Sequence, residues 1–188
     1  MSKHASHRSS FLTAVFVFLC TALWIPVAPA HADEYQDAIA QAFPRFQILS
    51  RSEFDPEIQE TVKTNPALVT GLFNDDKRED FAAVIRDRAK QAAKQGVREY
   101  YLGKVVVCHG LGKRQYQCQV LTELPIFLPY ATYLHRVEPG KVGCPNEEGT
   151  VTHVTVERDA IGYVIVHSNG AGVYIYKPDG TYFNCAGE

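Results

Sequence analysis

The sequence predicts an α+β fold: two N-terminal helices on a mainly antiparallel, twisted sheet that ends in a C-terminal meander and is stapled by disulfides. Three observations predict it. Two turn signals near the end of the chain, Ser168-Asn169-Gly170-Ala171 and Pro178-Asp179-Gly180, separate short apolar segments. Apolar residues near the start of the domain recur at helical spacing. Four cysteines, an even number, follow residue 32, as is typical of a disulfide framework in an exported chain.

Residues 1–32 are predicted to be a cleaved signal peptide. Lys3 and Arg8 precede an apolar run, and Ala30-His31-Ala32 supplies small residues at the positions that a signal peptidase reads. The apolar run, 11–25, is shorter than the roughly 20 residues that a membrane-spanning helix needs, and Pro26 breaks it. We therefore expect one α+β domain over 33–188, periplasmic or secreted, with no membrane contact after cleavage.

Charge excludes two classes of partner for this domain. The chain has 19 basic and 21 acidic residues, and removing Lys3 and Arg8 with the signal leaves 17 basic against 21 acidic. A mild and mixed charge has no electrostatic footprint for nucleic acid or for an anionic membrane.

Two helices are expected early in the domain. Phe54-Asp55-Pro56-Glu57-Ile58 offers an N-cap Asp, a Pro at the first helical position and an acidic first turn, and this helix should stop before Pro66. The segment 88–98 is helical by propensity but has little apolar stripe, so a mobile connection is the alternative. The first helix is predicted from a stripe that ends before Pro44: Tyr35, Ala38, Ile39, Ala42 and Phe43.

Strands are predicted from apolar runs between turn residues. Those before the meander are 67–73, 80–86, 100–108, 115–122 and 150–156. The three strands of the meander are 161–167, 172–177 and 181–185.

Folding the chain at both turn signals assigns the two faces of the meander. Val166 then lies opposite Val173, and Ile175 lies opposite both Val164 and Phe183. We expect this face, which also holds Cys185, to be the more buried. The opposite face collects Ile165 and the tyrosines Tyr163, Tyr174, Tyr176 and Tyr182. These tyrosines are a candidate binding surface, because Tyr is favoured at interfaces. The alternative is that other elements cover them as core.

Four cysteines remain after the signal peptide, Cys108, Cys118, Cys144 and Cys185. Local geometry favours Cys108–Cys118, because strands flanking the loop 109–114 then place Val106 opposite Val120 and Val105 opposite Leu121. Cys144–Cys185 follows by difference. No Cys-x-x-Cys pair is present, which argues against zinc binding and thiol redox chemistry.

An acidic loop between two apolar runs has the shape of a cation site. Asn74, Asp76 and Asp80 occupy positions where a strand–loop–strand calcium site places oxygen ligands. The segment resembles an FG-GAP (integrin-like) repeat, whose loop reads Asp-x-Asn-x-Asp-Gly-x-x-Asp before a Phe/Tyr-Ala strand. Leu72 replaces the first acid of that pattern and Lys77 the turn glycine. The resemblance implies a degenerate calcium site, so we expect no cofactor.

The whole chain also resembles small uncharacterised exported bacterial proteins that join such a loop to a Val-Val-Val-Cys-His strand and a tyrosine-rich terminal meander. That likeness implies no activity. The histidines His109, His135, His153 and His167 lack HExxH spacing, and no Gly-x-Ser-x-Gly elbow is present. We read His109 as a half-exposed residue of a hairpin loop.

The sequence therefore predicts a non-enzymatic binding module with an exported protein as partner, such as an inhibitor or immunity-type protein. A small periplasmic hydrolase that uses a His and a carboxylate is the alternative, and a calcium-stabilised structural domain is the third.

Overall fold

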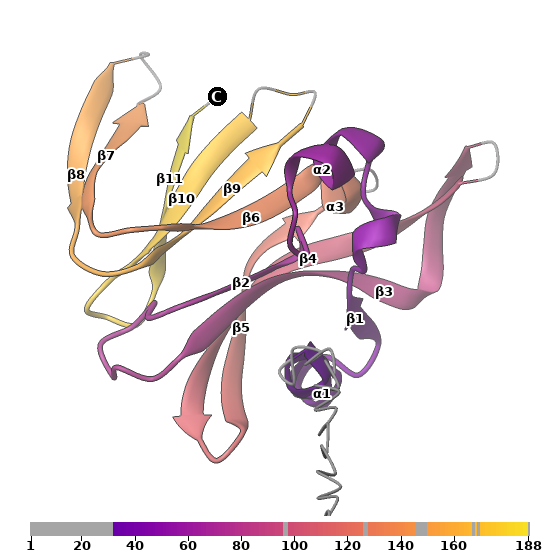
Figure 1. Ribbon diagram of the computed structural model, residues 1–188, viewed down its shortest axis with the longest axis horizontal. Helices are drawn as coiled ribbons and strands as arrows, with labels where there is room; N and C mark the ends of the chain where they lie inside the picture. The colour runs from indigo at the N-terminus through magenta and orange to yellow at the C-terminus, as the bar shows by residue number, and fades with distance from the viewer. Residues whose placement is uncertain are drawn as a thin grey trace, which may run out of the picture.

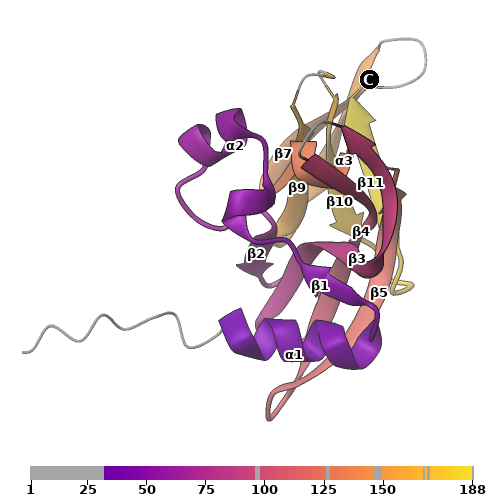
Figure 2. The same cartoon turned by 90° about the vertical axis from the view of Figure 1, so that its right-hand side faces the viewer.

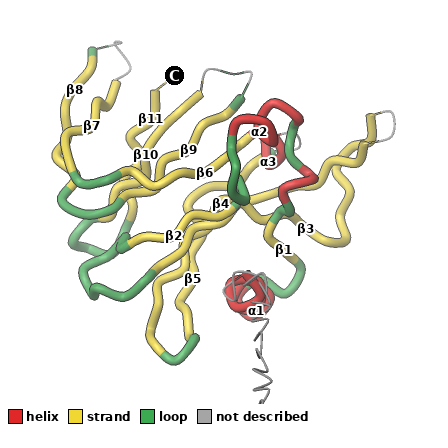
Figure 3. Tube along the Cα trace, in the orientation of Figure 1, coloured by secondary structure: helices red, strands yellow, loops and turns green. Residues whose placement is uncertain are grey.

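The computed structural model describes residues 32–187 apart from 96–97, 126–127, 146–149, 167 and 169. The predicted signal peptide therefore lies, except for Ala32, outside the described residues, and so does His167. Within them the molecule is mostly antiparallel β-sheet with three short α-helices (Figures 1 and 3). The antiparallel strands and the disulfides of the predicted α+β fold are thus confirmed, but far more residues lie in strands than in helices.

The strands form two sheets and a separate hairpin instead of the single sheet that we expected. The first sheet has the order β1-β3-β4-β5, and β2 also pairs with β3. Its strands are β1 (Phe46–Ile48), β2 (Leu68–Gly71), β3 (Asp80–Gln95), β4 (Arg98–Gly112) and β5 (Gln115–Leu124). The second sheet, in the order β11-β10-β9-β6, consists of β6 (Thr132–Val137), β9 (Ala160–Ile165), β10 (Gly170–Tyr176) and β11 (Tyr182–Gly187). The hairpin is β7 (Gly140–Pro145) with β8 (Val151–Val156).

The long hairpin β3–β4 corrects one prediction. The segment 88–98, predicted as a helix or a mobile connection, belongs to β3 and to the start of β4. The two strands stay paired out to Gln95 and Arg98, with register shifts near Gln91. Pairing with a long neighbouring strand outweighs the helical propensity of Ala, Lys and Gln, which is overridden where no apolar stripe supports a helix.

Both predicted N-terminal helices are present. α1 (Ala32–Ala42) buries Tyr35, Ala38 and Ile39, and it runs across one face of the first sheet (Figure 2). α2 (Pro56–Thr61) begins where predicted, with Pro56 in its first turn, and buries Ile58. A third helix, α3 (Leu128–Ala131), was not predicted. The N–H of Asp55 donates to the carbonyl of Tyr130 at 3.1 Å, which ties the start of α2 to α3 (Figure 3).

The first sheet is buried on both faces. α1 covers the face of Phe81, Ala83, Ile85 and Val106. The second sheet, α2 and α3 pack on the other face, where Val84, Val105 and Val107 belong to the larger core with Phe54, Phe73 and Tyr174. These central strands are continuous apolar runs, as expected when a strand has no solvent-facing side.

Both predicted disulfides are present. Cys108 and Cys118 lie directly opposite in β4 and β5, with Cα atoms 4.0 Å apart. Val106 lies opposite Val120 as predicted, but a register shift places Val105 opposite Thr122 and not Leu121. Cys144–Cys185, with Cα atoms 5.2 Å apart, joins β7 to β11.

The meander has the predicted register at one turn only. Ile175 lies opposite Phe183, as predicted. Between β9 and β10, Val164 lies opposite Ala171, a shift of four residues from the predicted partner Ile175. On its other side β9 is held by β6: Thr132 lies opposite Ile165, and the N–H of Val166 continues this pairing by donating to the carbonyl of Ala131 at 2.9 Å. An even shift leaves every side chain on its predicted face.

Candidate functional site

The acidic loop is organised around one buried carboxylate. Asp80 is fully buried at the start of β3. Its Oδ2 accepts the backbone N–H groups of Phe73 and Asn74 at 2.9 and 3.2 Å, and its Oδ1 accepts the N–H of Gly110 at 3.0 Å. A carboxylate that accepts three amides closes the loop and fixes it to β4.

The other two predicted ligands also bind backbone amides. Asn74 Oδ1 accepts the N–H of Asp76 at 3.0 Å, and Asp76 Oδ1 accepts the N–H of Arg78 at 2.9 Å. Such bonds are typical of Asx turns. Within the described residues, no group of three or more His, Cys, Asp or Glu side chains is arranged to hold a metal ion. In this structure the side-chain oxygens of the loop accept hydrogen bonds from backbone N–H groups.

His109 lies in a strand and not in the predicted hairpin loop. β4 continues to Gly112, and the turn narrows to Lys113 and Arg114, both at positive φ. The His109 side chain is only 14% exposed, and its Nδ1 is 3.2 Å from Asp80 Oδ2. Sequence reasoning missed this pair because Asp80 and His109 lie on different strands, which the antiparallel β3–β4 pairing brings together.

Two of the predicted tyrosines surround His109. The Tyr182 ring stacks at an interplanar angle of 11°, with its hydroxyl 3.4 Å from His109 Nε2. The Tyr176 ring lies edge-on, with centroids 5.8 Å apart. Burial, reinforced by the charge of Asp80, raises the pKa of Tyr182. The phenol therefore stays protonated around neutral pH, and a cavity of about 350 Å³ opens beside His109 and Tyr176.

The other two tyrosines serve the core. Tyr174 is 4% exposed within the larger core, so it cannot contact a partner directly. The Tyr163 ring covers Gly172, where a Cβ would come within 2.6 Å of the Tyr163 hydroxyl. Our expectation that the Val173–Cys185 face is the more buried was wrong. Cys185 is buried, but Phe183 is 39% exposed because the tyrosine face is the one that packs against the first sheet.

The remaining described histidines do not join His109. His153 is exposed in β8. The His135 ring lies on Gly162 of the neighbouring strand β9, where a Cβ would come within 2.3 Å of it. Partial burial lowers the pKa of His135. Both are accounted for as residues of β-strands.

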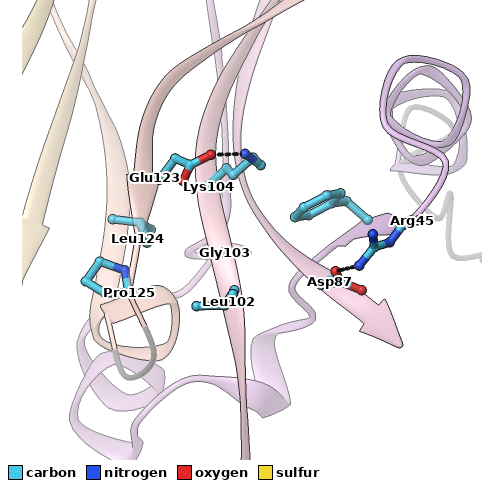
Figure 4. A pocket seen from close by; sticks show the side chains of 9 residues that line it. Arg45, Asp87, Leu102, Gly103, Lys104, Glu123, Leu124 and Pro125 are labelled. Carbon is cyan, nitrogen blue, oxygen red and sulfur yellow. Dashed lines mark hydrogen bonds and ion pairs between the residues drawn. The ribbon is translucent and has the colours of Figure 1, made fainter. Parts of the chain in front are cut away.

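A groove of about 410 Å³ crosses the face of the first sheet that α1 packs on (Figure 4). Arg45 and Asp87 form an ion pair at 2.5 Å on one side of it, and Lys104 pairs with Glu123 on the other. The groove is also lined by Phe46, Leu102, Gly103, Leu124 and Pro125.

No motif in the sequence indicated the groove. It is assembled from the chain at β1, β3, β4 and the end of β5, four segments separated by up to about 80 residues, each contributing one to three residues. The short alternation around Phe46 was the only local signal, and it is too brief to identify a strand.

Comparison with protein-family models, with curated proteins and with solved structures finds no match for this chain. None of the described helices is long and apolar enough to cross a membrane.

Proposed function

We propose that this chain is an exported, non-enzymatic module that binds an extended segment of another exported protein in the groove of Figure 4. The predicted signal peptide and the two disulfides support a periplasmic or secreted location. An inhibitor or immunity-type protein acts by such binding.

The distribution of charge around the groove carries the proposal. Asp87 is 5% exposed and holds Arg45, whose side chain is 66% exposed. On the other side Lys104 is 21% exposed and Glu123 is 77% exposed. The groove thus presents a cation on one side, an anion on the other and an apolar floor between them. This arrangement fits a polypeptide with an apolar side chain between an acidic and a basic residue.

A random-peptide phage library, panned against the mature chain, tests the groove. We expect the selected peptides to share an apolar residue flanked by opposite charges, since the apolar anchor supplies most of the affinity. Leu102→Glu places a charge in the groove floor and should weaken binding of the selected peptides about tenfold or more, which corresponds to about 1.4 kcal/mol.

Leu111→Glu is the matched control, because Leu111 is an exposed leucine at the other end of the same strand. Circular dichroism establishes that both variants are folded. If no peptide is enriched, or if both variants bind the selected peptides equally, the groove is not the binding site.

The Asp80–His109 pair supports a hydrolase as the second candidate. A carboxylate lies 3.2 Å from Nδ1 of an imidazole, as in a general-base pair, and a cavity lies beside it. The buried Nδ1, however, makes no hydrogen bond within the described part of the chain, so the carboxylate does not orient the ring. The position of the Tyr182 hydroxyl at 3.4 Å from Nε2 weighs against it, because the phenol occupies the place of a substrate or a water. The side-chain oxygens of Asn74, Asp76 and Asp80 accept hydrogen bonds from backbone N–H groups, which likewise weighs against a calcium-stabilised domain.

A further inference from the structure

β5 forms an open edge of the first sheet. β4 pairs with one side of it, and no other strand in the described part of the chain pairs with the other side. The Cα atoms of Cys108 and Cys118 are 4.0 Å apart, which is the short spacing of a non-hydrogen-bonded antiparallel pair. At such a pair the backbone N–H and C=O of each residue point away from the partner strand. The polar backbone groups of Tyr116, Cys118 and Val120 therefore face the open edge.

This edge lacks the usual protection against pairing. Solvent-exposed edge strands commonly carry charges or proline, which discourage another strand from adding. The segment 115–122 of β5 contains neither. Val120 is 40% exposed, and the register shift that interrupts the strand comes only after it. Residues 115–120 thus offer a regular, uncharged edge.

We propose that a second copy of this chain adds to this edge, β5 against β5, antiparallel about a two-fold axis at Cys118. The outward groups of Tyr116 then meet those of Val120 in the second copy, and Cys118 meets its own counterpart. Gln117 lies opposite Gln119 of the second copy. The aromatic and β-branched side chains of Tyr116 and Val120, and the amides of the two glutamines, are favourable cross-strand pairs.

Charge complementarity favours a second copy over an unrelated strand. β5 is preceded by the basic turn Lys113-Arg114 and carries Glu123 near its other end. Within its own copy Arg114 already pairs with Glu34, and Glu123, which is 77% exposed, pairs with Lys104. Antiparallel pairing at Cys118 brings Lys113 of each copy beside Glu123 of the other. The same contact forms twice because the axis is two-fold. A parallel arrangement would place like charges together instead.

Disulfide trapping tests the register. Gln117→Cys and Gln119→Cys variants, mixed under mild oxidation, should form a covalent dimer, because these residues are directly opposite in the proposed pair. Either variant alone should form far less, since its own thiols lie two positions apart along the strands and beyond disulfide reach. Equal trapping in the mixture and in the single variants would overturn the register.

Sedimentation equilibrium of the mature chain tests the dimer itself. We expect a mass of two chains, and Val120→Lys should raise the dissociation constant roughly tenfold or more by placing a charge in the edge. Val151→Lys is the matched control, since Val151 is also exposed but lies in β8. A monomer at all concentrations up to about 1 mM, or equal effects of the two lysines, would refute the proposal.

Discussion

Among the residues that the structure describes, three other than glycine adopt the left-handed backbone conformation: Lys77 at φ 60°, Lys113 at φ 51° and Arg114 at φ 60°. An L-residue pays roughly 1–2 kcal/mol for this region, whereas glycine enters it freely. Lys77 stands at the position where the acidic-loop pattern carries glycine. The backbone therefore turns there as the pattern requires, although the residue that normally permits the turn is absent.

Lys77→Gly should stabilise the protein. Relief of the left-handed penalty, offset by the greater entropy of glycine in the unfolded chain, leaves a gain of about 0.5–1 kcal/mol, or a melting temperature about 1–4 °C higher. Thermal unfolding followed by circular dichroism measures it. Arg78→Gly is the control, because Arg78 is not among the residues at positive φ and should lose stability. A loss at both positions would show that Lys77 is not strained.

At the scale of the element, the meander shows how alternation leaves the choice of face open. β10 alternates apolar and tyrosine side chains, and β11 begins with Tyr182 and Phe183 on opposite faces, so both faces carry large side chains suitable for burial. Contact with the first sheet selects the tyrosine face, and Tyr174 enters the core with its pKa raised by burial. Phe183, a larger hydrocarbon than its neighbours, remains 39% exposed on the other face, where the Lys177 ammonium lies 5.5 Å from its ring centroid.

Truncations on the two faces should differ in cost. Tyr174→Ala removes a buried ring and should lower the free energy of unfolding by about 3–5 kcal/mol. Phe183→Ala, on the exposed face of the adjacent strand, should lower it by less than about 1 kcal/mol. Chemical denaturation of both variants, compared at constant m-value, measures the difference. Equal costs would indicate that the two faces are equally buried in solution.

At the scale of the whole molecule, Cys144–Cys185 holds the β7–β8 hairpin to the second sheet. The hairpin forms a sheet of its own, and this bridge crosses 41 residues of sequence to join it to β11. Cys108–Cys118, by contrast, joins neighbours within one hairpin. Cys144–Cys185 therefore stabilises the position of the β7–β8 hairpin on the second sheet, and Cys108–Cys118 stabilises the pairing of β4 with β5.

Cys144→Ala with Cys185→Ala should release the hairpin. The chain-entropy model for a loop of this length gives a loss of about 4 kcal/mol. Hydrogen exchange should show faster exchange at the amides of β7 and β8, such as Val142 and Val154, while those of β4 and β5 keep their order of protection. Unchanged protection of Val142 and Val154 would mean that packing alone holds the hairpin.

The sequence by itself determined the features that depend on neighbours along the chain: α1 and α2, the β10–β11 register and Cys108–Cys118. Cys144–Cys185, which spans 41 residues, followed only by difference, because the other two cysteines were already paired. Helical spacing and the turn over Pro178-Asp179-Gly180, which the bond from Lys177 to Thr181 closes, act over a few positions, so they can be read locally. Only the tertiary structure decided the β9–β10 register, the buried side of the meander, the Asp80–His109 pair and the groove between Arg45 and Glu123. Each of these involves elements that are distant in the sequence, such as the packing of Tyr174 into the core that the first sheet shares. Local sequence patterns do not show which face of a strand will be buried, because burial depends on how whole sheets pack against each other.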